Sequence, residues 1–459
     1  MITKRTIYGA RAAFASALCI AALAAPVSAE SIRSALAAAY ENSNLLEQNR
    51  ALLRSEDENV AVALSALRPQ INGTSTITQS DQASNLPGGD LTSTISIGLD
   101  LLIFDAGSTR LGVEAAKETV LAVRAQLVAL EQQVLFDAVQ AYLNVLRDQR
   151  VVDLRQNNVR LITQELRAAQ DRFEVGEVTR TDVSQAEARL AESRGELAAA
   201  QGDLEISREL YRVTVGRRPG VLEPGRFIYP LPNSESSAIA VGQRENPNID
   251  QAQREIRANE LNAARAEANI RPRITLQAQA GHSERIDNNS SIGLTMNVPI
   301  YQGGQLRALV RRANAVVHAS RANLNQQVLL VQQGISDAWT NLVVSRAQVV
   351  SSQQQIRAAE VAFEGVREEA TLGARTTLDV LDAEQDLQDA RTNLVVAETT
   401  VFIAGYQLLA SMGVLTVDDL DLAVERYDPS EYYNAVKNAP VPVSPQGRNL
   451  NRILKRYDN

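Results

Sequence analysis

Cysteine, histidine and aromatic side chains are scarce in this chain of 459 residues. It has one cysteine, two histidines and a single tryptophan, and aromatic residues make up only 4% of the sequence. The chain has too few cysteine and histidine side chains for a typical zinc site or histidine-based catalytic site, so we expect no metal and no cofactor. Phosphate-binding glycine loops and nucleophile elbows are also missing, which argues against an enzyme. So few aromatic side chains argue against a thick globular core as well.

An excess of positive charge is missing too. Lys and Arg number 46 against 54 Asp and Glu, which gives a formal net charge of -8. Nucleic-acid-binding proteins normally show the opposite balance, so we expect no nucleic-acid partner. Ala, Leu, Val, Gln, Glu and Arg dominate the chain instead, and this composition is typical of long helices and coiled coils.

The first 29 residues have the pattern of a bacterial signal peptide. Basic residues flank a short apolar run, and Val27-Ser28-Ala29 reads as the cleavage site. We therefore expect an exported chain that begins at Glu30 and has no disulfide, because the single Cys19 lies in the removed segment. Beyond this segment we expect no apolar stretch of the ~20 residues that a membrane helix needs, so any membrane-spanning part must consist of strands.

The sequence contains an internal duplication. Four motifs recur in the same order, the last two at an offset of 197 residues (as from Gly176 to Gly373), and such recurrence indicates two structural repeats. We place the repeats at 30–215 and 239–428, with a Gly/Pro-rich linker at 216–238 and a polar, loosely ordered tail at 429–459. The motif pairs are Glu41-Asn-Ser-Asn44 with Glu245-Asn-Pro-Asn248, Arg68-Pro-Gln-Ile71 with Arg271-Pro-Arg-Ile274, Phe104-Asp-Ala-Gly107 with Tyr301-Gln-Gly-Gly304, and Val175-Gly176 with Leu372-Gly373.

Each repeat begins with a helix and a pair of strands. The helix is expected over about 32–67 and again over about 239–270, and a proline ends it. Alternating apolar and polar residues then predict two strands with one apolar and one polar face, over about 71–104 and about 274–301. Polar loops at 81–90 and 284–290 connect the strands. Taken alone, such a pair is more typical of a soluble hairpin packed on a core.

Two long helices complete each repeat. The first is expected over about 105–172 and again over about 304–369, and each is ~100 Å long at 1.5 Å per residue. After a turn that contains Gly176 or Gly373, a second helix returns, to about 215 or 412. Apolar and small residues alternate at spacings of three and four along these helices, which predicts coiled-coil packing. An ordinary helix bundle can show the same pattern.

Strands and helices together favour a membrane pore. Each hairpin lies between two helices, so the strands would form one end of a long object. Four strands of ~10 residues match the height of a bacterial outer membrane but cannot close a barrel, and an open sheet edge finds no hydrogen-bond partners in lipid. The chain must then oligomerise. Two copies would enclose a filled lumen, three could enclose a water-filled pore, and the polar inward faces favour the pore.

These features resemble the TolC family of outer-membrane efflux and secretion channels. The resemblance covers the chain from 30 to about 428. It rests on the duplication, on the Arg-Pro pairs before the strands, on the strand-to-helix junctions Phe104 to Gly107 and Tyr301 to Gly304, and above all on Gly373-Ala-Arg-Thr-Thr-Leu-Asp-Val-Leu-Asp382. It implies a mainly α-helical fold in which a homotrimer forms a twelve-stranded β-barrel in outer-membrane lipid and a helical tunnel in the periplasm.

The same resemblance implies partners and a gate. The partners are a periplasmic adaptor protein and an inner-membrane transporter, and drugs or secreted polypeptides would pass through passively. Asp379 and Asp382 match the aspartate rings of the family's periplasmic constriction. The closing network is matched by Arg375, Thr181 and Asp182. Ala370 stands where a tyrosine of that network is expected, which implies fewer closing bonds.

Two further interpretations stay open at this point. From the residues alone, an aspartate in such a turn is more often a helix cap or a solvated charge than a gate residue. A periplasmic adaptor or structural coiled-coil protein without a pore is the rival class, since it too has heptads and a signal peptide. It does not need duplicated amphipathic strands between long helices. The sequence indicates neither the cargo nor the partner pump.

Overall fold

The computed structural model describes residues 29–80, 90–283, 286–438, 440–441 and 444–457. All but the last residue of the expected signal peptide, and nearly all of the first expected hairpin loop, lie outside these ranges. The chain forms two compact units, and each is built of segments from both repeats. We call them the turn unit (residues up to 42, 137–228 and 345–403) and the sheet unit (43–136, 229–344 and 404–459).

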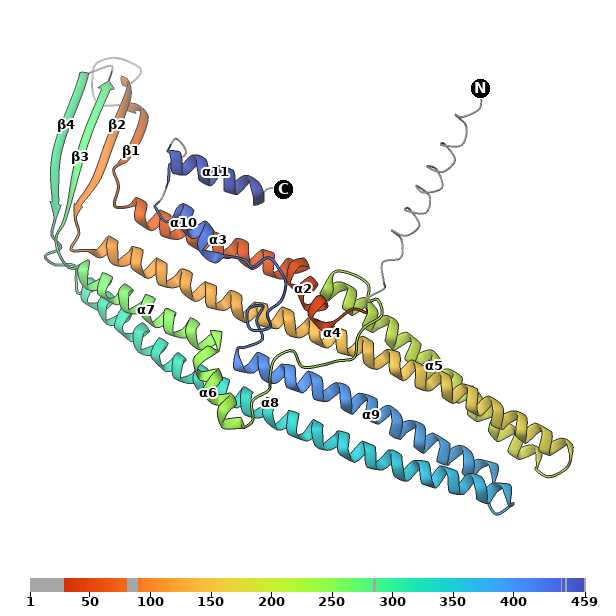
Figure 1. Ribbon diagram of the computed structural model, residues 1–459. Coiled ribbons are helices and arrows are strands. Elements are labelled where there is room, and N and C mark those ends of the chain that lie inside the picture. The colour runs from red at the N-terminus through yellow and green to blue at the C-terminus, as the bar shows by residue number, and fades with distance from the viewer. Residues whose placement is uncertain (1–28, 81–89, 284–285, 439, 442–443, 458–459) are drawn as a thin grey trace, which may run out of the picture. The chain divides into compact units, whose positions relative to one another are not determined.

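The sheet unit contains one antiparallel sheet of four strands (Figure 1). The strands are β1 (Gln70–Ser80), β2 (Asp90–Phe104), β3 (Arg273–Ser283) and β4 (Ile286–Asn297), and they are ordered β1-β2-β3-β4. β2 pairs with β3, so the strands of the two repeats are hydrogen-bonded to each other. The second hairpin is tighter than expected because β4 already begins at Ile286, within the segment expected to be a loop.

The long helices have the same lengths in both repeats. α4 (Ser108–Glu174) and α8 (Gln305–Thr371) each contain 67 residues, and α5 (Arg180–Val215) and α9 (Thr377–Met412) each contain 36. None of the four contains proline, and Ala, Leu, Val, Gln and Glu, which favour helix or tolerate it well, fill them. The expected duplication of helix, hairpin and two long helices is confirmed.

The first helix of each repeat is broken, so the single helices expected there are wrong. The first repeat has α2 (Ile32–Asn42) and α3 (Asn44–Ser65), and the second has α6 (Glu235–Glu245) and α7 (Pro247–Ala268). Ser43 caps α3 by accepting a hydrogen bond from Leu46 N. Asn246 caps α7, and Pro247 occupies its first turn, where no N–H is needed. The recurring Glu-Asn-x-Asn motifs therefore mark breaks between helices.

The tail is more ordered than expected. It forms α10 (Pro429–Val436) and α11 (Pro445–Tyr457). α10 packs on α3, where buried Tyr432 donates a hydrogen bond to Glu58 Oε1 at 2.7 Å. Arg124 of α4 donates a second bond, to the carbonyl oxygen of Pro429. These few anchoring contacts were not predicted because they depend on single side chains in a segment of polar composition.

α9 is also more apolar than expected. By length and composition alone it could cross a membrane, since an 18-residue window has a mean hydropathy of 1.4. The expectation that no such stretch follows the signal peptide is wrong by that measure. However, 39% of this window is buried within the structure, and a core helix of a soluble protein passes the same test. The hydropathy of α9 is therefore weak evidence for a membrane helix.

Candidate functional site

The sheet has one apolar and one polar face. The pairing register places Leu101 opposite Leu276, and Leu276 opposite Leu294, so apolar side chains of neighbouring strands line up on one face. Much of this face is exposed in the single chain, and Ile292 is 75% exposed. On the other face, Gln277 donates a hydrogen bond to Asp100 Oδ1 at 3.1 Å and accepts one from Thr295 at 3.1 Å. Such a sheet fits an environment that is apolar on one side and wet on the other.

Two tight junctions connect the strands to the long helices. Phe104 ends β2 opposite Ile274, and Asp105 then accepts hydrogen bonds from the backbone N–H groups of Gly107 (3.0 Å) and Thr109 (2.7 Å). Gly107 has φ +84° and Gly304, its counterpart, has φ +86°, a conformation that only glycine adopts without strain. The aromatic residue before each junction is exposed, Phe104 by 49% and Tyr301 by 87%.

The two helical turns are built in the same way. Gly176 follows α4 with φ +80°, and Gly373 follows α8 with φ +76°. The next N–H bonds back to the helix in each case, Glu177 N to Arg172 O at 2.9 Å and Ala374 N to Glu369 O at 3.0 Å. This is the Schellman arrangement that ends many helices at a left-handed glycine. Both turns belong to the turn unit.

Two glycine-to-alanine substitutions, one inside α8 and one in the turn after it, should change the stability of the protein in opposite directions. Gly373→Ala should destabilise the protein by about 1 kcal/mol, because an L-residue is strained at φ +76° even though open space surrounds the Cβ position. Gly365→Ala should stabilise it by about 0.5–1 kcal/mol, because Gly365 lies inside α8 and its Cβ position is also open. The midpoint of thermal unfolding in detergent measures both, and shifts of the same sign would contradict the prediction.

Two of the predicted gate residues cap helices in this chain. Asp182 Oδ2 accepts hydrogen bonds from Thr179 N (2.8 Å) and Thr179 Oγ1 (2.7 Å) at the start of α5. Asp379 Oδ2 makes the same pair of bonds with Thr376 (2.9 and 2.8 Å) at the start of α9. The backbone and hydroxyl bonds from Thr376 lower the pKa of Asp379, and Arg375 lowers it further, which keeps this carboxylate ionised. The capping role is the one favoured by the residues alone.

The structure does not bring Arg375 and Asp182 together. Arg375 Nε instead contacts Glu369 Oε2 at 2.9 Å, and this carboxylate raises the pKa of Arg375. Glu369 belongs to the end of α8, so the pair stays within one helical turn. Thr181 lies exposed in the first turn of α5. An ion pair between the two repeats comes from other residues.

Asp382 supplies one such link between the repeats, next to the turns. Its carboxylate pairs with Arg189 of α5, which also contacts Glu192 at 2.9 Å. Leu381, the residue before Asp382 in α9, packs in one apolar cluster with Ile162 of α4 and Leu190 of α5. Sequence reasoning missed Arg189. The available signal was a reversal of charge, because Arg189 corresponds to Asp386 in the second repeat at the offset of 197 residues.

A buried acid lies two residues further along α9. Glu384 has no exposed surface, and neither carboxylate oxygen has a hydrogen-bond partner among the described residues. The pKa of Glu384 is raised to about 8, mainly by burial and also by the nearby Glu165, while Arg367 and Arg189 act in the opposite direction. Its counterpart in the first repeat, Glu187, is exposed. Sequence reasoning did not single out Glu384.

The sequence of the whole duplicated region matches a known family. The model of the outer membrane efflux protein family matches residues 35–215 and 242–414, which covers both repeats. The chain belongs to this family. Its members are outer-membrane channel proteins, so the chain is an outer-membrane protein that extends into the periplasm, and the rival class of pore-less adaptors is not favoured.

Individual relatives agree with this assignment. The chain is 38% identical to outer membrane efflux protein BepC of Brucella suis biovar 1 over 418 residues, which cover 89% of this chain and 91% of BepC. It is 26% identical to outer membrane protein TolC of Vibrio cholerae over 415 residues, covering 87% and 94% of the two chains. The expected resemblance to the TolC family is thereby confirmed.

Solved structures show the same fold. A crystal structure of CusC superposes with a TM-score of 0.74 at 17% identity, over 83% of this chain and 92% of CusC. The outer membrane protein VceC from Vibrio cholerae superposes with a TM-score of 0.70 at 20% identity, over 83% and 96% of the two chains. The expected fold class, a mainly helical outer-membrane channel fold with a small membrane sheet, is confirmed.

Proposed function

We propose that three copies of this chain form a passive export duct through the outer membrane. Twelve strands would close a barrel in the lipid, and the long helices would form a tunnel in the periplasm with a gate at its inner end. The observation that carries this proposal is the sheet of four strands, whose apolar face is exposed and whose edges are β1 and β4. Each unpaired backbone group on such an edge costs several kcal/mol in lipid, so the edges must pair with other copies.

The composition of the polar face supports three copies rather than two. Eight strands from two copies would leave a lumen filled by side chains. The polar face carries Thr74, Thr94, Gln277 and Thr295, which are short or hydrogen-bonded groups that suit contact with water. Exposed Phe104 at the end of β2 and exposed Tyr301, four residues after the end of β4, suit the boundary between lipid and water, where aromatic side chains gather.

The assembly is tested by its mass. We expect the mature protein to require detergent for extraction and to elute with the mass of three chains, because only a closed barrel satisfies both sheet edges. Light scattering coupled to size exclusion, corrected for bound detergent, measures this mass, and averaging of particle images should show a three-fold axis. A stable monomer or dimer in detergent, or a mature chain that stays soluble in water without it, would refute the assembly.

The turn unit would supply the gate. Three copies of Asp379 and Asp382 would form a ring of acids around the axis, near the Gly176 and Gly373 turns. The pair Arg189–Asp382 joins the two helical hairpins of one chain, which supports a role in holding the constriction closed. Arg375, Thr181 and Asp182 are exposed or half-buried, and therefore available to a neighbouring copy. A partner that binds only the open arrangement would shift the gate toward opening.

The partners and the cargo follow from the relatives. BepC is named as an efflux protein, and a Pseudomonas aeruginosa relative, AprF, is named as an alkaline protease secretion protein. We propose that this channel works with a periplasmic adaptor protein and an inner-membrane transporter, in drug efflux or in type I secretion. Deletion of the gene should increase susceptibility to drugs or remove specific proteins from the medium. A deletion strain unchanged in both properties would refute this role.

A further inference from the structure

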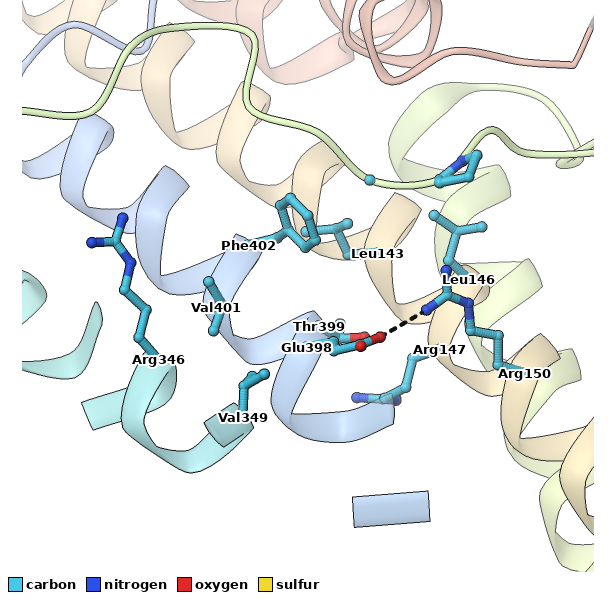
Figure 2. A pocket seen from close by; sticks show the side chains of 12 residues that line it. Leu143, Leu146, Arg147, Arg150, Arg346, Val349, Glu398, Thr399, Val401 and Phe402 are labelled. Atoms are coloured by element: carbon cyan, nitrogen blue, oxygen red, sulfur yellow. Dashed lines mark hydrogen bonds and ion pairs between the residues drawn. The ribbon is translucent and has the colours of Figure 1, made fainter. Parts of the chain in front are cut away.

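A cavity of about 420 Å³ lies within the turn unit (Figure 2). Its lining residues on α9 begin at Glu398, 16 residues after Asp382, one of the acids proposed for the gate. Residues of α4, α8, α9 and the linker after α5 line it, and the apolar part consists of Leu143, Leu146, Val349, Val401 and Phe402. Gly225 brings the linker close to this floor, because a Cβ at that position would lie 2.9 Å from Leu143 Cδ2. Phe402 also packs against Phe227 of the linker, with ring centroids 5.1 Å apart.

Positive charge surrounds this apolar floor. Arg147, Arg150 and Arg346 line the cavity, and Glu398 is the one acid among its lining residues. Glu398 is engaged by Arg150 at 3.2 Å, as the dashed line in Figure 2 marks, and Arg147 contacts Asp148 at 2.7 Å. For Arg346, no hydrogen bond or ion pair is found within the described part of the chain. The lining therefore holds more positive than negative charge, with one guanidinium left for a ligand.

The duplication shows that the helical scaffold does not require these cations. At the offset of 197 residues, Arg147 and Arg150 correspond to Val344 and Ala347 in the second repeat, and Arg346 corresponds to Gln149 in the first. Phe402 likewise corresponds to Glu205. α4 and α8 have the same length although the equivalent positions of the other repeat lack this combination of arginines and apolar residues. The combination is specific to one surface of the chain.

We propose that the cavity binds a small amphiphilic anion, with an apolar body and a single carboxylate or sulfonate group. Its volume is in the range of ordinary ligand pockets, about 300–1,000 Å³. The body would lie against Leu143 and Phe402, and the anionic group would meet Arg346, whose planar guanidinium binds such groups through two hydrogen bonds. A bound anion contacts α4 of the first repeat and α8 and α9 of the second. Because the anion contacts both repeats at once, its binding stabilises the packing of α4 against α8 and α9 that forms the cavity.

Binding of naphthalene sulfonate to the full-length trimer in lipid nanodiscs tests the proposal. Titration calorimetry and saturation-transfer NMR should show saturable binding to one site per chain. Arg346→Ala should weaken the affinity by about tenfold or more, the effect expected when a charged hydrogen-bond partner is lost. Arg346→Lys should retain part of the affinity because it keeps the charge. Neutral naphthol and cationic naphthylmethylamine should bind more weakly than the sulfonate.

Arg357→Ala is the matched control. Arg357 is exposed and lies three turns further along α8, outside the cavity, so its loss should leave the affinity unchanged. Equal affinities in the Arg346→Ala and Arg357→Ala variants would overturn the proposal, as would equal binding to empty nanodiscs or equal binding of the cationic analogue. If the parent protein does not bind the sulfonate and the Arg346→Ala variant has a changed oligomeric mass, another copy of the chain fills the cavity. This outcome also overturns the proposal.

Discussion

Replacing Glu384 with glutamine should stabilise this protein at neutral pH and should remove a pH dependence of its stability. The carboxyl group is fully buried on α9, and neither of its oxygens has a hydrogen-bond partner among the described residues. The charges that face it come from three other helices, Glu165 on α4, Arg189 on α5 and Arg367 on α8. Burial dominates over the two arginines, so the net effect is a raised pKa.

The direction of the pH effect follows from the two pKa values. The pKa of Glu384 is about 8 in the folded chain against an ordinary 4.5, so folding takes up a proton between these values. The folded state therefore loses stability as the pH rises through this interval, and the contribution of Glu384 is least unfavourable below pH 4.5. At pH 7 the cost is at most about 3–4 kcal/mol, since pH 7 lies about 2.5 units above the ordinary pKa and each pKa unit corresponds to about 1.4 kcal/mol. Glutamine has no charge to neutralise, so Glu384→Gln removes this cost.

Glu187→Gln is the matched control for this experiment. Glu187 occupies the same position in the first repeat but is exposed, and a surface substitution of this kind is expected to change the stability by less than about 0.5 kcal/mol. The midpoints of thermal unfolding of the two variants and the parent should be compared across the pH interval. A parent and a Glu384→Gln variant with parallel pH profiles would show that Glu384 is ionised in the folded protein.

Loss of Arg189 should open the channel. The Arg189–Asp382 pair joins α5 to α9 at the turns, whereas Arg375 is held by Glu369 of its own turn. We therefore expect Arg189→Ala to raise single-channel conductance in planar bilayers severalfold, and Arg375→Ala to raise it less. The family resemblance leads us to expect a tyrosine where this chain has Ala370, and a gate that closes with fewer bonds would reduce both effects. Equal and unchanged conductance in both variants would place the constriction elsewhere.

The proposed ring of acids predicts block by cations. Asp379→Asn combined with Asp382→Asn should weaken the block of conductance by a trivalent cation added from the periplasmic side, because the ring attracts multivalent cations. Asparagine keeps the shape of the side chain, and the cap of α9 is thereby disturbed less than by alanine. Asp386→Asn, a change to an exposed acid on the same helix, is the control. Undiminished block in the double variant would rule out these two acids as the ring.

Much of the fold was predictable because its elements repeat. Period-two alternation predicted strands such as β2, and the alternation of three and four predicted α5 and α9, since each pattern reports a face that must be buried or lipid-exposed. The breaks at Ser43 and Asn246 were not predicted, although the motifs that contain them were found. Capping depends on one side chain and one N–H group, and a search for apolar periodicity does not detect such a local bond.

The candidate site was less predictable than the fold. The resemblance pointed to Asp182 and Arg375, yet in this chain Asp182 caps α5 and Arg375 pairs with Glu369. Arg189, which links the repeats next to the turns, carries no local motif. An ion pair between distant helices depends on how those helices rotate about their axes, and a single sequence does not state this.

The sequence by itself determined the duplication, the order of elements and the family, because repeated motifs and periodicity are properties of the chain read in order. The tertiary structure alone decided which member of each repeated pair is buried. Ala186-Glu187 and Ala383-Glu384 are identical dipeptides at the same place in two helices of equal length. Glu187 is exposed and Glu384 is buried among α4, α5 and α8. Burial depends on what packs against a helix face, and that neighbour comes from a distant part of the chain.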